Sequence, residues 1–461
     1  MGMKKEVVIV GGGPGGASSA MVLLKQGIKP LIIEAEKFPR YHIGESLTGG
    51  GGQVLRELGF EDEMNKRQHP QKQGVKVYGQ SKVGTWFVPV TGRDKDWNLF
   101  QWNTWHVRRS DFDTMMLTEA QSRGAEMLHG KAIRPILKDD GSVKGLEVRF
   151  DGSDKSEIID TEMILDCSGQ ATWLANLGGF TGPKYLGAYD KQIAIFSQVA
   201  NTVRDHGGTR DTHPDNTVIL YASKFHWAWF IPLDAENVSV GICVPSQYFL
   251  SKNESLEDFY HREMHELHPE LKRRVPDRRR TEEVHVIPNY SYQVKQFSGK
   301  GFLCIGDAHR FVDPIFSFGV TMAMWEAQLA APKVKAYLGG EGRDKKLPFA
   351  DHQLFCEKGI DVLEDLIDCF WERPFAFGMF VHQRYTDYMT DLFATRIYEH
   401  QPSPGVDACR KMLGREGVRE VSYQNEDLYS VPIGSRYHPE RAPIWEPNAT
   451  VETTEEWLGP R

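Results

Sequence analysis

The 461-residue chain has few cysteines, no long apolar run and no excess of positive charge. Its 6 cysteines are scattered, without a Cys-x-x-Cys pair or a Cys/His pair at metal-binding spacing, which argues against a zinc site or a disulfide framework. No apolar stretch approaches the roughly 20 residues that cross a bilayer, and the amino-terminal one is too short for a secretory signal. The net charge of -8 offers nucleic acid no general attraction. We therefore expect a cytoplasmic protein without a metal, nucleic-acid or membrane partner.

Glycine, in contrast, is abundant, and several glycines gather near the amino terminus. The run Val7-Val8-Ile9-Val10 predicts a buried strand, residues 17–26 predict a helix, and Leu31-Ile32-Ile33 predicts a second strand. Residues 11–16, between the first strand and the helix, match G-x-G-x-x-G. The alternative is a glycine-rich turn without a ligand. The order strand, turn, helix, strand favours a dinucleotide site instead.

The residue types of this motif suit a pyrophosphate. Glycines permit the tight turn, the close approach of the phosphates and the packing of helix on strand, and the helix amino terminus offers oriented N–H groups. Glu34 ends the second strand about 20 residues further on, where a carboxylate can accept hydrogen bonds from ribose hydroxyls. The predicted dinucleotide-binding residues are Gly11, Gly13, Pro14, Gly15, Gly16 and Glu34.

Three later segments extend this pattern. Asp307 follows the apolar run 302–305, which puts its carboxylate at the carboxyl end of a predicted strand; residues 166–169 end another such run, and Arg109 precedes a predicted helix. With the glycine motif, these segments resemble FAD enzymes of the aromatic-hydroxylase type, within the flavin monooxygenase superfamily. The resemblance implies non-covalent FAD, with Asp307 at its ribityl chain and Arg109 and Gly319 against it. A surface arginine is the alternative reading of Arg109.

The fold class follows from the order of these elements. We expect an α/β protein with a Rossmann-like FAD-binding domain of the aromatic-hydroxylase type, an antiparallel substrate-side sheet and a helical carboxyl-terminal region. Short alternating runs interrupt the nucleotide-binding segments, so the first domain is discontinuous in sequence. It is predicted to cover residues 1–347 (about 1–75, 103–190 and 289–347), with inserted sheet segments at about 76–102 and 191–288, followed by a mainly helical cap and tail at 348–461.

A tryptophan motif narrows the resemblance. Residues 227–232, Trp-Ala-Trp-Phe-Ile-Pro, fit the W-x-W-x-I-P signature of the flavin-dependent halogenases. In that family the tryptophans are thought to wall the flavin off from the organic substrate, so the predicted wall residues are Trp227, Trp229, Ile231 and Pro232. From the residues alone, a core strand with two aromatic rings on one face explains the motif as well.

Lys72, in Gln71-Lys72-Gln73-Gly74, lies in the K-x-G context of the lysine that is essential in this family. The resemblance implies that Lys72 holds hypohalous acid, as a hydrogen-bonded species or as a haloamine, and aims it at the substrate. Burial would lower the pKa of the amine and make its neutral form accessible. Most lysines are solvated surface residues, and Lys66 and Lys76 lie close by.

Residues 311–320 resemble the loop that binds halide next to the flavin. The predicted halide-site residues are Pro314, Ser317, Phe318 and Gly319. Two positions depart from the family. Phe316 stands where tryptophan halogenases have a glutamate, which favours the phenol and pyrrole branch. Phe318 replaces the usual Ser or Thr, which leaves the choice among chloride, bromide and iodide open.

The resemblance implies an oxidoreductase that uses reduced FAD, oxygen and halide to make hypohalous acid and to halogenate an electron-rich small aromatic substrate. A separate NAD(P)H-dependent flavin reductase would supply the reduced FAD, and a carrier protein that presents the substrate is left open as a partner. The alternative is a monooxygenase or reductase of the same superfamily that acts directly from the flavin. A non-enzymatic flavin-binding protein is a third hypothesis.

Overall fold

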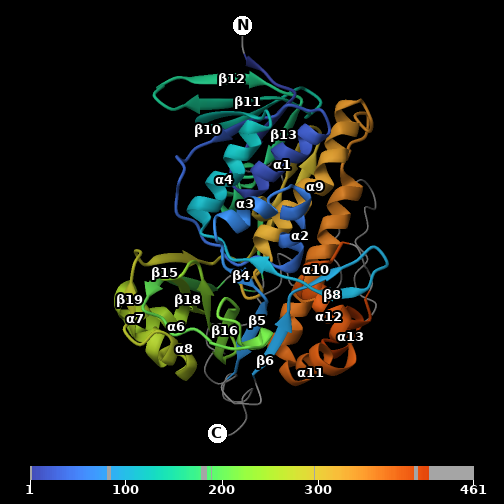
Figure 1. Cartoon of the computed structure of the whole chain (residues 1–461). Helices are drawn as coiled ribbons and strands as arrows, with labels where there is room; N and C mark the ends of the chain where they lie inside the picture. The colour runs from blue at the N-terminus through green and yellow to red at the C-terminus, as the bar shows by residue number, and fades with distance from the viewer. Residues whose placement is uncertain are drawn as a thin grey trace.

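The computed structural model describes residues 3–79, 85–177, 184–187, 189, 191–294, 296–398 and 403–414. Figure 1 shows an upper part, which contains the predicted nucleotide-binding segments, and a lower part with a second sheet on the left and a group of helices on the right. The helix α10 (Ala350–Glu372) descends along the right side and joins the two levels. The two sheets and this helical group surround the site described below.

The upper sheet has nine strands in the order β1-β12-β11-β10-β3-β2-β13-β23-β22. In its centre β2 (Val7–Val10) pairs in parallel with β3 (Leu31–Glu34) and β13 (Met163–Asp166), and β13 pairs in parallel with β23 (Phe302–Cys304). Every residue of these four strands is buried, which accounts for their uninterrupted apolar runs. The other strands are β1 (Met3–Lys4), β10 (Glu126–Leu137), β11 (Val143–Phe150), β12 (Ser156–Asp160) and β22 (Ser298–Gly299).

Different layers cover the two faces of this central sheet. Side chains of α1 (Pro14–Lys25), α2 (Gly49–Glu57), α4 (Arg109–Ser122) and α9 (Gly319–Leu338) pack on one face. The ribbon formed by β10, β11 and β12 packs on the other face. The glycine turn before α1 and the turn before α9 therefore lie at the same edge, the carboxyl ends of the parallel strands.

The lower sheet has eight strands, in the order β19-β15-β18-β17-β16-β5-β6 with β20 beside β15. Alternation along β17 (His226–Pro232) sends Trp227, Trp229 and Ile231 to the inner face and Ala228 and Phe230 to the outer face, under α7 and α8. The other strands of this sheet are β5 (Gly74–Tyr78), β6 (Trp86–Pro89), β15 (Gln192–Ala200), β16 (Thr217–Ser223), β18 (Val238–Pro245), β19 (Arg279–Arg280) and β20 (His285–Pro288). The helices beside it are α6 (Ser246–Lys252), α7 (Leu256–Glu266) and α8 (Pro269–Arg274).

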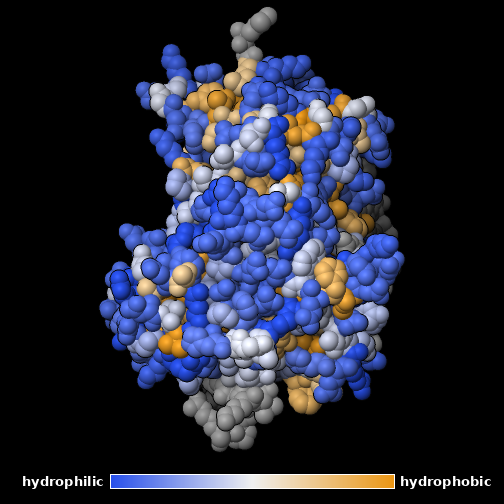
Figure 2. Space-filling view, viewed as in Figure 1, coloured by the Kyte–Doolittle hydropathy of each residue, from blue (hydrophilic) through white to orange (hydrophobic). Residues whose placement is uncertain are grey.

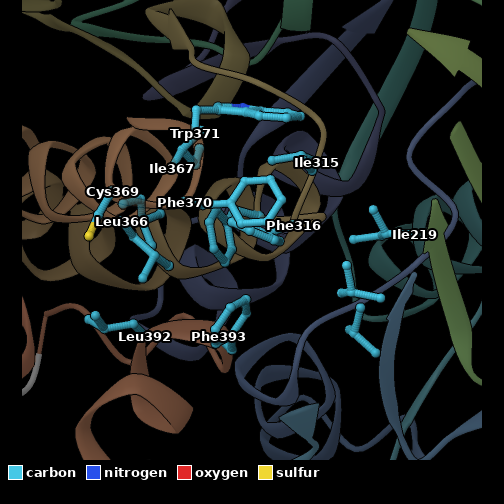
Figure 3. Close-up of a cluster of buried hydrophobic side chains, with 14 of the residues drawn as sticks. Ile219, Ile315, Phe316, Leu366, Ile367, Cys369, Phe370, Trp371, Leu392 and Phe393 are labelled. Atoms are coloured by element: carbon cyan, nitrogen blue, oxygen red, sulfur yellow. The ribbon is translucent and has the colours of Figure 1, made fainter. Parts of the chain in front are cut away.

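The carboxyl-terminal helices close the inner face of the lower sheet with aromatic rings. In Figure 3, Phe370 of α10 lies against Phe316 of the loop before α9, with ring centroids 5.4 Å apart, and Phe393 packs on the same ring at 4.9 Å. Phe375, in contrast, is 82% exposed and takes no part in this cluster. The helices after α10 are α11 (Pro374–Met379), the π-helix Phe380–Arg384, α12 (Thr386–Phe393) and α13 (Pro404–Met412).

The predicted fold class is confirmed, and the exact limits of its discontinuous domain stay a prediction. The predicted tail beyond residue 414 lies outside the described residues. None of the described helices has both the length and the apolar character that crossing a membrane requires. The face in Figure 2 is mainly hydrophilic, with small separate apolar patches. The remaining elements are α3 (Glu61–Lys66), α5 (Trp173–Asn176), β4 (Gln71–Lys72), β7 (Thr91–Arg93), β8 (Leu99–Gln101), β9 (Thr104–Trp105), β14 (Lys184–Leu186), β21 (Tyr292–Val294) and β24 (Arg310–Phe311).

Candidate active site

A cavity of about 510 Å³ lies between the two sheets, at the carboxyl ends of β2 and β3. Its lining includes the glycine turn, residues 40–46, the inner face of the lower sheet, and residues of the loop that leads into α9. Ligands of open α/β sheets bind at the carboxyl ends of the strands. The cavity is therefore the place where a dinucleotide is expected.

The glycine turn is closed toward the protein and open toward this cavity. A β-carbon at Gly16 would lie 1.9 Å from the Gly11 carbonyl oxygen, and one at Gly11, where φ is +103°, would lie 2.4 Å from the Cys167 carbonyl oxygen. At Gly13 the nearest atom to such a β-carbon is Nη2 of Arg40, at 3.5 Å. The helix α1 has no acidic residue in its first turn, so its free N–H groups can donate hydrogen bonds to an anion. These features fit the pyrophosphate of FAD.

Glu34 and Arg40 lie beside the glycine turn and line the cavity. The Glu34 carboxylate accepts hydrogen bonds from the backbone N–H groups of Gly12, at 2.6 Å, and of Glu36, at 2.7 Å, and it has further lone pairs for a ribose. Arg40 was not among the predicted residues, because no spacing rule marks it. Its guanidinium is the positive charge nearest to the open side of Gly13.

Arg109 and Asp307 line the same cavity. Arg109 donates to both oxygens of Asp113, at 2.6 and 2.9 Å, which fixes its guanidinium in the wall. Asp307 lies in the short turn after β23, where Glu326 of α9 accepts from the Gly306 N–H at 2.6 Å. Burial raises the pKa of Asp307 to about 7.

The tryptophan motif forms part of the cavity wall. Trp227, Trp229 and Ile231 line the cavity, whereas Pro232, at the end of β17, does not. Both tryptophans are buried, and their ring centroids are 5.8 Å apart. The motif is thus at once a core strand and a wall of the site, so the two readings of its sequence are compatible.

Residues on the neighbouring strand β18 fix the Trp229 ring. A β-carbon at Gly241 would lie 2.1 Å from this ring, so the indole lies flat over a glycine. The Trp229 Nε1–H donates to the Ser239 hydroxyl at 3.0 Å. Next to Ser239 lies Glu45, a buried residue that lines the cavity. Burial raises the pKa of Glu45 to about 7. No sequence motif marks these three residues.

The predicted halide residues Pro314, Ser317, Phe318 and Gly319 all line the cavity. Ser317 adopts φ 61°, and its N–H donates to the Pro314 carbonyl at 3.0 Å, so this amide is not available to an anion. Phe318 and Gly319 stand at the first positions of α9, where backbone N–H groups lack intrahelical acceptors. Phe318 is 4% exposed and packs beside Phe316.

Lys72 is buried to 2% exposure but does not line the cavity. It lies on the two-residue strand β4, which pairs with β9. Its Nζ donates to the Ser46 hydroxyl at 2.9 Å and to the Leu47 carbonyl at 3.0 Å. Burial lowers the pKa of Lys72 to about 7. All of the predicted site residues line the cavity except Gly16, Pro232 and Lys72. Lys72 lies directly behind Ser46, which is part of the cavity wall.

Fold and site together define an FAD-binding oxidoreductase of the aromatic-hydroxylase type. Residues 4–353 match the family model for the FAD binding domain. The chain is 36% identical to a 1H-pyrrole-2-carbonyl-[peptidyl-carrier protein] brominase of Pseudoalteromonas luteoviolacea over 354 residues, which cover 77% of this chain and 82% of the brominase. It is 28% identical to the corresponding chlorinase of Pseudomonas fluorescens over 459 residues, which cover 95% of this chain and 99% of the chlorinase.

Among solved structures, the flavin-dependent brominase Bmp2 superimposes with a TM-score of 0.82 at 32% identity, covering 89% of this chain and 98% of the brominase. The chain belongs to the family of flavin-dependent halogenases. FAD is its cofactor and a halide ion is its co-substrate.

Proposed function

We propose that this halogenase acts on a 1H-pyrrole-2-carbonyl group attached to a peptidyl-carrier protein, and that Lys72 directs hypohalous acid to the ring. The burial of Lys72 carries the second part of the proposal. A charged amine costs free energy at a buried position, so a lysine with a pKa near 7 beside a cofactor cavity is best explained by its chemistry. The substrate and carrier are inferred from the names of the brominase and the chlorinase.

Bound FAD, delivered reduced by a separate NAD(P)H-dependent flavin reductase, supplies with oxygen the oxidising equivalent that turns halide into hypohalous acid. The glycine turn, Glu34 and Arg40 would hold its pyrophosphate and ribose, and Asp307 would hold the ribityl chain. The halide lies at the start of α9, because the free N–H groups of Phe318 and Gly319 and the helix dipole favour an anion there. Since the Ser317 N–H is engaged, we assign no halide contact to it.

The wall of Trp227, Trp229 and Ile231 keeps the substrate away from the cofactor. A small oxidant such as hypohalous acid then has to pass from the flavin to the substrate, and Lys72 holds it on the way as a hydrogen-bonded species or as a haloamine.

The experiment that tests this proposal is Lys72→Ala with reduced FAD, oxygen, bromide and pyrrolyl carrier protein. Halogenated product is expected to disappear, while FAD affinity and oxygen consumption by reduced flavin stay near wild type, because Lys72 touches neither step. Product at the wild-type rate would contradict the role of Lys72. Free pyrroles and phenols, assayed beside the carrier-bound group, decide whether the carrier is required.

The control is Lys66→Ala, because the Lys66 side chain is 79% exposed and makes only a long ion pair with Glu63, at 3.6 Å. It is expected to match wild type. Lys76 is a poorer control than its sequence position suggests: its side chain is only 14% exposed and pairs with Asp211 at 2.9 Å. Its loss would disturb β5, which pairs with β16 and β6 in the lower sheet.

A further inference from the structure

Two hydroxyl groups form the wall between the cavity and Lys72. Ser46 and Thr217 both line the cavity, whereas Lys72 does not. The Ser46 Oγ lies 2.9 Å from the Lys72 Nζ and 2.8 Å from the Thr217 Oγ1. All three residues are at most 2% exposed. A molecule in the cavity therefore meets these hydroxyls before it meets the amine.

The hydrogen-bond donors and acceptors of these three residues define the direction in which a proton can pass, from Lys72 toward the cavity. An ammonium has no lone pair, so Ser46 must accept from Lys72; in the arrangement that carries a proton onward, Ser46 in turn donates to Thr217. The Thr217 hydroxyl proton has no other hydrogen-bond acceptor within the part of the chain that the structure describes. It is therefore available to a molecule in the cavity.

We propose that Ser46 and Thr217 are positioning residues that extend the hydrogen bonding of Lys72 to the cavity wall, so that Lys72 acts on hypohalous acid bound at Thr217. This inference rests on the proposed function. It also chooses between the two forms left open there: formation of a haloamine needs direct contact between the halogen and Nζ, whereas a hydrogen-bonded oxidant needs only the hydroxyl chain.

Proton transfer along this chain balances the halogenation step. The ring carbon forms a bond to the halogen, and the bond between halogen and oxygen breaks. The oxygen leaves as water with a proton that Lys72 supplies through Ser46 and Thr217. The ring carbon then releases its own proton, which restores the ammonium through solvent. No further oxidant or reductant is consumed.

The charge of the chain is set by Lys72 alone. Its second hydrogen bond goes to the Leu47 carbonyl, and its neighbour on β9 is the uncharged Thr104. Burial together with the charge of Lys72 keeps the pKa of His106 well below its ordinary range. His106 is therefore neutral wherever Lys72 titrates. Removal of the Ser46 acceptor should destabilise the ammonium and lower the pKa of Lys72.

The test compares Ser46→Ala, Thr217→Val and Thr217→Ser with wild type and Lys72→Ala. Taurine in the buffer traps free hypohalous acid as a stable haloamine, so each reaction gives a ratio of halogenated pyrrole to trapped oxidant. We expect Ser46→Ala and Thr217→Val to lower this ratio at least tenfold, as Lys72→Ala does, whereas Thr217→Ser restores it because it keeps the hydroxyl. The pH midpoint of the ratio should fall in Ser46→Ala.

The matched control is Thr104→Val, which removes a buried hydroxyl beside Lys72 that has no hydrogen-bond partner in the described structure. It should leave both ratio and midpoint unchanged. Wild-type ratios in Ser46→Ala and Thr217→Val, with the ratio lost in Lys72→Ala, would overturn the hydroxyl chain and leave the proposed function intact. An unchanged ratio in Lys72→Ala would overturn the proposed function itself. If Thr217→Val fails to bind FAD, an unshifted midpoint in Ser46→Ala still refutes the chain.

Discussion

Replacement of Lys72 by methionine should stabilise the protein at low pH, because it removes a buried charge. Burial lowers the pKa of Lys72 from 10.5 to about 7. Between these values the unfolded chain binds the proton and the folded chain does not, so wild-type stability rises with pH through this window and the full cost is present below pH 7. A shift of about 3.5 units at 1.36 kcal/mol per unit corresponds to a cost on the order of 5 kcal/mol.

The assay is urea unfolding of wild type and Lys72→Met at about pH 6 and about pH 9. The linkage relation predicts that the stability advantage of Lys72→Met is larger at pH 6 by about 3 kcal/mol. Loss of the hydrogen bond to the Leu47 carbonyl costs about 1 kcal/mol at both pH values and cancels in this comparison. A stability difference that does not change with pH would refute the lowered pKa of Lys72.

Three further predictions concern the cavity wall. Gly13→Val should fold, because its β-carbon meets only Arg40 at 3.5 Å, but it should bind no FAD. A normal flavin spectrum would contradict the assignment of the glycine turn to the pyrophosphate. Phe318→Thr should change the relative use of chloride, bromide and iodide, and unaltered halide competition would mean that this ring does not face the anion. Ser239→Ala leaves the buried Trp229 N–H without its acceptor and should cost about 1–2 kcal/mol in thermal unfolding; an unchanged stability would show that another group accepts it.

Local patterns could be predicted from the sequence where one short segment carries the chemistry. The glycine turn and its strands follow from spacing alone, because residues 7–34 form a single local unit. Alternation along β17 likewise places Trp227 and Trp229 on one face. The halide loop is predicted by its resemblance to the family. Only the structure shows that the Ser317 N–H donates to the Pro314 carbonyl and is therefore not available to an anion.

Features that depend on distant segments could not be predicted. The position of Lys72 behind Ser46 requires the pairing of β4 with β9, and neither two-residue strand has a recognisable pattern. Ser239 and Gly241 hold Trp229 only because β18 lies beside β17. Arg40 and Glu45 lie in a connection without regular structure, where periodicity gives no information. The roles of these residues depend on contacts between segments that are far apart in the sequence.

The reaction of reduced FAD with oxygen in this protein should lead to halogenation of the substrate and not to its direct oxygenation. The most direct test is mass spectrometry of the wild-type products formed from reduced FAD, oxygen, bromide and pyrrolyl carrier protein, with free pyrroles and phenols in parallel. We expect a brominated ring, identified by the isotope pair of bromine, and no such product when halide is omitted. An oxygenated ring, formed with or without any halide, would contradict it.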